Sequence, residues 1–161
     1  MKTTKADLYR GDGAVVALPV VERILHPTDL ADTSVRALTL AIKLARQNHA
    51  ELLLAHALPP PTPIFEIESF ERSSSELDLE LLVERLSREG IRARKILIKG
   101  TRSVPGNIAE CAKFFGADLI VMGTRSRRGL ARFFRGSIAA CVVKTAPCPV
   151  LVVPNRSSAT L

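Results

Sequence analysis

The chain has 161 residues, enough for one domain with a full core, and its 47% hydrophobic but only 4% aromatic content predicts an aliphatic core. The formal net charge of +7 favours anionic partners such as nucleotides, nucleic acids or acidic lipids without choosing among them. No signal peptide and no apolar stretch of about 20 residues is visible, so we expect neither export nor membrane spanning.

The first 22 residues differ from the rest of the chain. Residues 1–13 are polar and contain two glycines, which is typical of a loose arm. Residues 14–18 are apolar and could cover a sheet edge or add a short strand. We therefore expect an N-terminal arm or an extra strand over residues 1–22, the main domain over residues 23–154, and a flexible tail over residues 155–161.

Strands and helices are predicted to alternate through the main domain. The helical spacing of apolar residues predicts helices over 35–47, from a Ser-x-x-Glu capping box at Ser73 to a stop at Gly90, around 108–115 with a stop at Gly116, and over 138–145. Prolines between residues 59 and 63 predict an extended loop. Short apolar runs predict strands at 23–29, 51–58, 92–99, 118–122 and 150–153.

These runs are continuous rather than alternating, which indicates a parallel sheet covered by helices on both faces. The fold class is therefore α/β. In such a sheet, ligands bind beyond the carboxyl ends of the strands. If the first strand lies beside the fourth, Asp29 faces the loop at residues 123–137 across a crevice, where its carboxylate could accept hydrogen bonds from ribose or cap the following helix.

The loop at residues 123–137 carries five arginines and no acid. It joins a predicted strand to a predicted helix that opens at Gly136-Ser137. Backbone N–H groups at a helix start, a hydroxyl and small residues can bind phosphate. A solvated basic loop with Ser137 as an ordinary N-cap is the alternative. The chain lacks a GxxxxGK[ST] loop, a GxGxxG motif and a recognisable catalytic set, which favours binding over fast catalysis.

The three cysteines lack CxxC spacing, and Cys111 and Cys141 fall on apolar positions of predicted helices. We therefore expect free, reduced cysteines, in the core of a cytoplasmic protein. The three histidines show no metal-ligand spacing, so no metal site is predicted from the side chains.

The chain resembles the universal stress protein family. The resemblance is carried by ILHPTD at residues 24–29, LLAHA at 53–57, ADLIVMGT at 117–124, and the stretch 129–154 that ends in APCPVLVVP. It implies an open five-stranded parallel sheet of strand order 3-2-1-4-5, similar to the adenine nucleotide alpha hydrolase fold. It also implies a cytoplasmic homodimer that pairs through the last strand, from about Val150 to Val153. A protein partner of unknown identity is expected as well.

The ATP-binding members of this family carry Gly, two residues, Gly, nine residues, then Gly-Ser or Gly-Thr. Gly123, Gly136 and Ser137 match this spacing, whereas Ser126 replaces the second glycine. By the same resemblance, the adenosine side of the site would consist of Pro27, Thr28, Asp29 and Ala57. The phosphate side would consist of Met122, Gly123, Arg125, Ser126, Gly136, Ser137 and Ile138.

The expected function is a dimeric stress-response regulator that binds ATP, with AMP or ADP as alternatives and Mg²⁺ or Mn²⁺ accompanying the phosphates. Any ATP hydrolysis or self-phosphorylation would be slow and secondary. The first alternative is a nucleotide-free dimer that serves as a protein-interaction scaffold, with Ser126 marking a lost site. A nucleic-acid binder ranks lower, because Phe133 and Phe134, which lie within the basic cluster, are expected in the core or at an interface and not as stacking residues.

Overall fold

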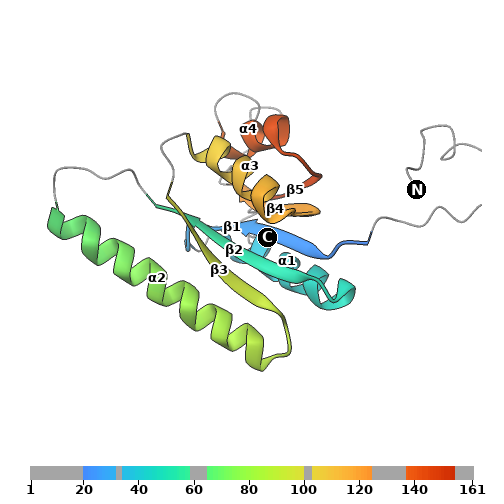
Figure 1. Cartoon of the computed structure of the whole chain (residues 1–161), viewed down its shortest axis with the longest axis horizontal. Helices are drawn as coiled ribbons and strands as arrows, with labels where there is room; N and C mark the ends of the chain where they lie inside the picture. Colours follow the sequence, from blue (N-terminus) through green and yellow to red (C-terminus); the bar gives the residue numbers. More distant parts are fainter. Residues whose placement is uncertain (1–19, 32–33, 59–64, 100–102, 125–136, 155–161) are drawn as a thin grey trace, which may run out of the picture.

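The computed structural model describes residues 20–31, 34–58, 65–99, 103–124 and 137–154, with the backbone alone over 65–74 (Figure 1). Its five strands form one parallel sheet in the order β3-β2-β1-β4-β5, as predicted. The possible strand at residues 14–18 lies outside the described residues. The strands are β1 (Arg23–Pro27), β2 (Glu51–Ala57), β3 (Ala93–Ile98), β4 (Leu119–Thr124) and β5 (Val150–Pro154).

Four helices cover the two faces of the sheet. They are α1 (Val35–Asn48), α2 (Phe65–Arg88), α3 (Val104–Phe115) and α4 (Ile138–Thr145). In Figure 1, α3 and α4 lie above the sheet, and α1 and α2 lie below it. None of the helices in the described ranges has the length and apolar character needed to cross a bilayer.

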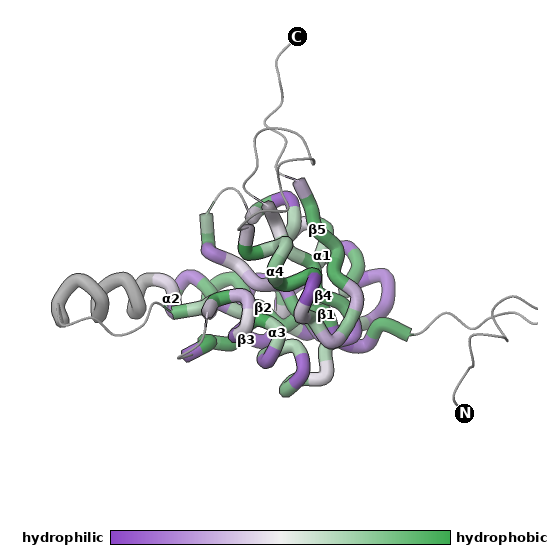
Figure 2. The backbone as a smooth tube through the Cα atoms, turned by 90° about the horizontal axis from the view of Figure 1, so that it is seen from above, coloured by the Kyte–Doolittle hydropathy of each residue, from purple (hydrophilic) through white to green (hydrophobic). Residues whose placement is uncertain are grey.

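Successive residues of a strand point to opposite faces, so each buried strand contributes to two cores. On β1, Leu25 packs with residues of α3 and α4, whereas Ile24 packs with residues of α1 and α2. On β4, Ile120 and Val121 divide in the same way. In Figure 2, most of β5 is coloured hydrophobic, which is typical of a strand in a parallel sheet.

The residue that we predicted for the start of the second helix was wrong. We predicted that the capping box at Ser73 begins it, but α2 begins at Phe65 and Ser73 lies inside the helix. The residues from 65 to 72 contain neither glycine nor proline. Because serine costs only a few tenths of a kcal/mol within a helix, the box does not stop a helix that has already formed.

Two smaller predictions also need correction. The fourth strand, predicted over 118–122, runs from Leu119 to Thr124 as β4, with Gly123 paired to Val153 and Thr124 to Pro154. Cys141 is exposed rather than in the core, whereas Cys111 is buried. Burial raises the pKa of Cys111 to about 11, so its thiol stays protonated near neutral pH.

Candidate functional site

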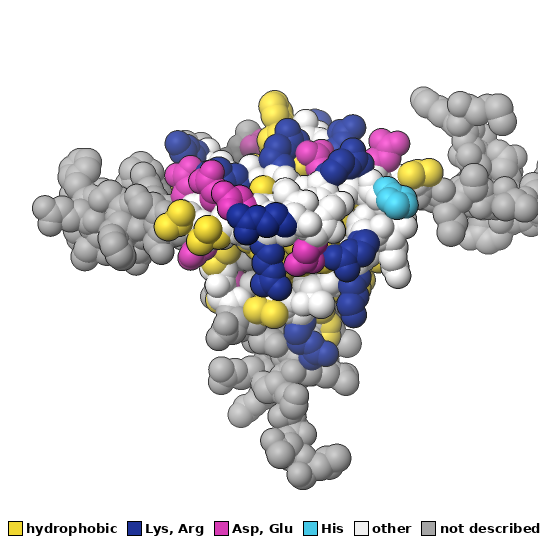
Figure 3. All heavy atoms as spheres, turned by 90° about the horizontal axis from the view of Figure 1, so that it is seen from below, with side chains coloured by type: hydrophobic (Ala, Val, Ile, Leu, Met, Phe, Trp, Pro, Cys, Tyr) yellow, Lys and Arg dark blue, Asp and Glu magenta, His cyan; other side chains and the backbone are white. Residues whose placement is uncertain are grey.

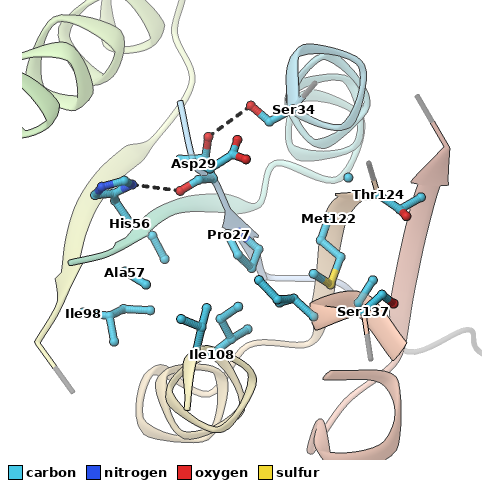
Figure 4. A pocket seen from close by; sticks show the side chains of 16 residues that line it. Pro27, Asp29, Ser34, His56, Ala57, Ile98, Ile108, Met122, Thr124 and Ser137 are labelled. Atoms are coloured by element: carbon cyan, nitrogen blue, oxygen red, sulfur yellow. Dashed lines mark hydrogen bonds between the residues drawn. The ribbon is translucent and has the colours of Figure 1, made fainter. Parts of the chain in front are cut away.

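A cavity of about 490 Å³ opens at the carboxyl ends of the strands, where sequence analysis placed the site (Figure 4). Its walls come from the segment after β1, the ends of β2, β3 and β4, and the first turns of α3 and α4. This volume suits a small organic ligand. The lining residues are Pro27, Thr28, Asp29, Ser34, Ala55, His56, Ala57, Ile98, Val104, Ile108, Met122, Gly123, Thr124, Ser137, Ile138 and Ala139.

Eight of the eleven residues in the predicted site line this cavity. They are Pro27, Thr28, Asp29, Ala57, Met122, Gly123, Ser137 and Ile138. Arg125, Ser126 and Gly136 lie outside the described residues, so the arginine-rich part of the predicted phosphate loop is not placed. That any of these residues contacts a nucleotide stays a prediction.

The prediction did not include eight other lining residues. His56 and Ile98 lie at strand ends, so the rule that parallel strands end at one edge could have found them. The apolar spacing within α3 could not show that Val104 and Ile108 face a cavity rather than a closed core. The remaining four are Ser34, Ala55, Thr124 and Ala139.

The segment after β1, which we call the β1–α1 turn (residues 27–31), is fixed by its own side chains. Thr28 Oγ1 accepts a hydrogen bond of 3.0 Å from the Leu30 N–H, and Asp29 Oδ1 accepts one of 3.1 Å from the Ala31 N–H. Leu30 adopts a left-handed conformation with φ of 58°. Such a conformation costs a non-glycine residue roughly 1–2 kcal/mol, so these bonds hold a strained turn in place.

The hydrogen bonds around this turn show which hydroxyl group is the donor in the contact between Thr28 and Ser34. Ser34 Oγ donates its single proton to the Ala31 carbonyl oxygen at 2.8 Å. In the bond of 3.2 Å between Thr28 Oγ1 and Ser34 Oγ, Thr28 must therefore be the donor. The Thr28 hydroxyl is thus used by the turn. Asp29 is the one acidic residue among the described residues that line the cavity.

The other end of the site is the start of α4. Ser137 is the N-cap of this helix, and its Oγ accepts a hydrogen bond of 3.1 Å from the Ala140 N–H. From the sequence alone, this N-cap role is the alternative to phosphate binding. The first turn of a helix carries N–H groups without intrahelical partners and a partial positive charge. The N-cap role and phosphate binding are compatible, because the cap occupies only one of these N–H groups.

Between these polar ends, much of the lining is aliphatic. Ala55, Ile98, Ile108 and Met122 line this part of the cavity, and the described lining contains no lysine or arginine. An aliphatic wall can accept the face of a flat ring, whereas hydroxyl and phosphate groups need the polar ends.

His26 lies beside the site, one residue before Pro27 on β1, and is fully buried. Its Nδ1 bonds to the Val121 carbonyl oxygen at 2.8 Å, so Nδ1 carries the proton and Nε2 is a buried acceptor without a partner among the described residues. Burial lowers the pKa of His26 below its ordinary value of 6.5, against the opposing effects of the Val121 bond and the Asp29 carboxylate. The side chain is therefore neutral at pH 7.

Within the described ranges, no three side chains of the metal-binding types gather to hold a metal ion.

Both a family model and individual proteins of known family are similar in sequence to this chain. A family model described as the universal stress protein family matches residues 21–154. The universal stress protein MJ0531 of Methanocaldococcus jannaschii is 36% identical over 145 residues, which are 82% of this chain and 81% of that protein.

Solved structures match as well. A universal stress protein family member from Burkholderia pseudomallei has a TM-score of 0.70 and 27% identity, covering 86% of this chain and 99% of its own. A universal stress protein from Archaeoglobus fulgidus in complex with dAMP has a TM-score of 0.63 and 25% identity, covering 83% of this chain and 98% of its own.

Proposed function

Because the chain belongs to the universal stress protein family, we propose that it binds an adenine nucleotide in the cavity at the carboxyl ends of the strands. ATP is the proposed ligand, with AMP and ADP as alternatives, and the protein acts as a dimeric regulator in the stress response. The observation that carries this proposal is the cavity itself, which has a carboxylate from Asp29, an aliphatic middle and a helix N-terminus at Ser137. The dAMP complex of the Archaeoglobus relative supports the ligand class.

The chemistry of the cavity suggests how the nucleotide lies. The Asp29 carboxylate can accept hydrogen bonds from ribose hydroxyls, and charge-assisted bonds of this kind are stronger than neutral ones. The aliphatic residues Ala57, Ile98 and Ile108 offer surface to the adenine ring. The N–H groups at the start of α4, beside Ser137 and Ile138, suit the phosphates.

The proposed site also includes three residues that lie outside the described ranges. Arg125, Ser126 and Gly136 belong to it by their place in the family motif. We propose that Mg²⁺ or Mn²⁺ accompanies the phosphates, held mainly by phosphate oxygens, which are the hard ligands these ions prefer.

The charge pattern on one face of the described molecule favours a nucleotide over a nucleic acid as the anionic partner. On the face seen in Figure 3, basic and acidic side chains are interleaved. Among the described residues, Arg46 pairs with Glu89 at 3.0 Å and Lys95 pairs with Glu80 at 2.9 Å. A nucleic-acid surface would instead gather positive charge along one path.

The proposed dimer uses β5. This strand stands at the end of the sheet order, so among the described residues it pairs with a strand on one side only, which is β4. Unpaired edge strands are ready to add a strand from another copy. Leu151, near the middle of β5, is exposed and apolar. The protein partner of such a dimer is left to be identified by experiment.

The proposal is tested by thermal unfolding with ligands. A ligand that binds only the folded state at 100 times its Kd adds about 2.7 kcal/mol of stability. For a chain of this size, that corresponds to a rise in Tm of about 5–10 °C. We expect this rise with millimolar ATP and Mg²⁺, and a much smaller one with tripolyphosphate and Mg²⁺, which controls for binding of anions to a basic protein. No rise with ATP, ADP or AMP would favour the nucleotide-free scaffold.

A further inference from the structure

We propose that His56 is a positioning residue whose imidazole ties the β1–α1 turn to the end of β2 and so fixes Asp29 at the cavity. Its effect on ligand affinity rests on the proposed nucleotide-binding function, but the tie itself is testable without any ligand. The basis is a hydrogen bond of 2.9 Å between His56 Nδ1 and the Thr28 carbonyl oxygen, which Figure 4 shows as a dashed line.

This bond lies where the backbone pairing of β1 with β2 ends. The last paired residues are Pro27 and Ala55, and the Thr28 N–H still donates to the Ala55 carbonyl oxygen at 2.8 Å. The Thr28 carbonyl group belongs to the planar peptide unit that leads into Asp29. Holding this oxygen therefore fixes the plane from which the Asp29 backbone departs.

The other side-chain bonds described for the turn stay within it or reach Ser34. The Thr28 hydroxyl bonds to the Leu30 N–H and to Ser34, and Asp29 Oδ1 bonds to the Ala31 N–H. These bonds shape the turn but do not reach β2. His56 supplies a side-chain link between this strained turn and the sheet.

The bond also determines the tautomer of His56. A carbonyl oxygen only accepts hydrogen bonds, so His56 Nδ1 must be the donor. In the neutral ring, the proton is then on Nδ1 and Nε2 is unprotonated. This is a property of the ligand-free protein.

Nitrogen NMR of the three histidines in wild-type protein, at a pH where all are neutral, tests the tie directly. We expect a protonated Nδ1 for His56, as for His26, which makes the equivalent bond to Val121. His49 is exposed and serves as the comparison, and the variants His56→Asn and His49→Asn assign the signals. A His56 ring protonated on Nε2 would overturn the proposal.

Two variants separate the effect of losing the hydrogen-bond donor from the effect of losing the ring. His56→Leu keeps an aliphatic side chain of similar size but has no donor, whereas His56→Asn places an amide nitrogen close to the position of Nδ1. Loss of one net hydrogen bond should weaken AMP and ATP binding about three- to tenfold in His56→Leu. His56→Asn should stay within about twofold of wild type.

Hydrogen exchange of the Leu30 and Ala31 amides gives a second readout that needs no ligand. We expect these amides to exchange about three- to tenfold faster in His56→Leu and close to the wild-type rate in His56→Asn. Unchanged amide exchange in His56→Leu, or an equal increase in the exchange rate in both variants, would contradict a role for the donor.

If wild-type protein binds no adenine nucleotide, the proposed function fails, while the tautomer and the exchange rates still decide about His56. If His56→Leu does not fold, the wild-type tautomer decides.

Discussion

Asp29 takes part in the turn and also lines the cavity. Oδ1 accepts the Ala31 N–H at 3.1 Å, and the residue also lines the cavity. From the sequence alone, Asp29 could either cap the following helix or accept hydrogen bonds from a ligand. The structure shows Ser34, not Asp29, as the N-cap of α1. Asp29 instead closes a turn of its own, and the cavity role stays a prediction.

Substitution of Asp29 tests that role. Asp29→Asn keeps a carbonyl oxygen that can accept the Ala31 N–H but loses the negative charge. Hydrogen bonds to charged groups contribute about 1.5–3 kcal/mol, so we expect the Kd for ATP to rise roughly tenfold or more by titration calorimetry. Asp78→Asn, on the exposed side of α2, is the matched control and should leave Kd unchanged. Equal affinity of Asp29→Asn and wild type would remove Asp29 from the site.

His26 makes folding stability depend on pH. Because its pKa is lowered in the folded state, the unfolded chain binds more protons just below pH 6.5. The contribution of His26 is thus fully present above about pH 6.5 and is lost as the pH falls from there towards the folded-state pKa. The slope approaches about 1.4 kcal/mol per pH unit at most for one proton.

The variant His26→Asn isolates this effect, since asparagine can still donate to the Val121 carbonyl oxygen but does not titrate. Urea unfolding at several pH values between 5 and 7.5 should show a steeper fall in unfolding free energy for wild type than for the variant. Parallel curves would mean that His26 is protonated in the folded protein or does not contribute.

At the scale of elements, the caps of α3 and α4 differ although both are serines. Ser137 Oγ accepts the Ala140 N–H, whereas Ser103 makes no side-chain cap bond. The sequence pattern identified both helices but could not show which serine is used, because that depends on the χ1 angle and the path of the preceding loop. The capping box at Ser73 shows the same limit, since α2 runs through it.

Paired substitutions measure this difference. Ser137→Ala should lower the unfolding free energy by about 1 kcal/mol, because it removes a used N-cap. Ser103→Ala should change it by less than about 0.5 kcal/mol. Chemical denaturation of both variants checks the prediction. A loss from Ser103→Ala as large as that from Ser137→Ala would contradict the assigned caps.

At the scale of the whole molecule, the topology explains why the position of the cavity could be predicted from the sequence, whereas only some of its lining residues could. The continuous apolar runs indicate a parallel sheet, and a parallel sheet brings Asp29, Ala57 and Gly123 to one edge. Such reasoning finds residues at strand ends. It cannot find Val104 or Ile108, whose place at the cavity depends on how α3 crosses the sheet, a property set by tertiary packing.

The dimer proposed through β5 is also a question for the whole molecule. Leu151→Lys places a charge on the exposed part of this edge strand, and we expect it to shift the protein from dimer to monomer in size-exclusion chromatography with light scattering. Leu77→Lys, on an exposed position of α2, is the matched control and should leave the assembly unchanged. A monomeric wild type, or a dimer that survives Leu151→Lys, would count against pairing through β5.

A crystal structure of the protein grown with ATP and Mg²⁺ tests the central claim most directly. We expect density for ribose beside Asp29, for adenine against the aliphatic wall, and for phosphates at the N–H groups that follow Ser137. A cavity without nucleotide at saturating ATP, or a nucleotide bound elsewhere on the chain, would contradict the proposed site.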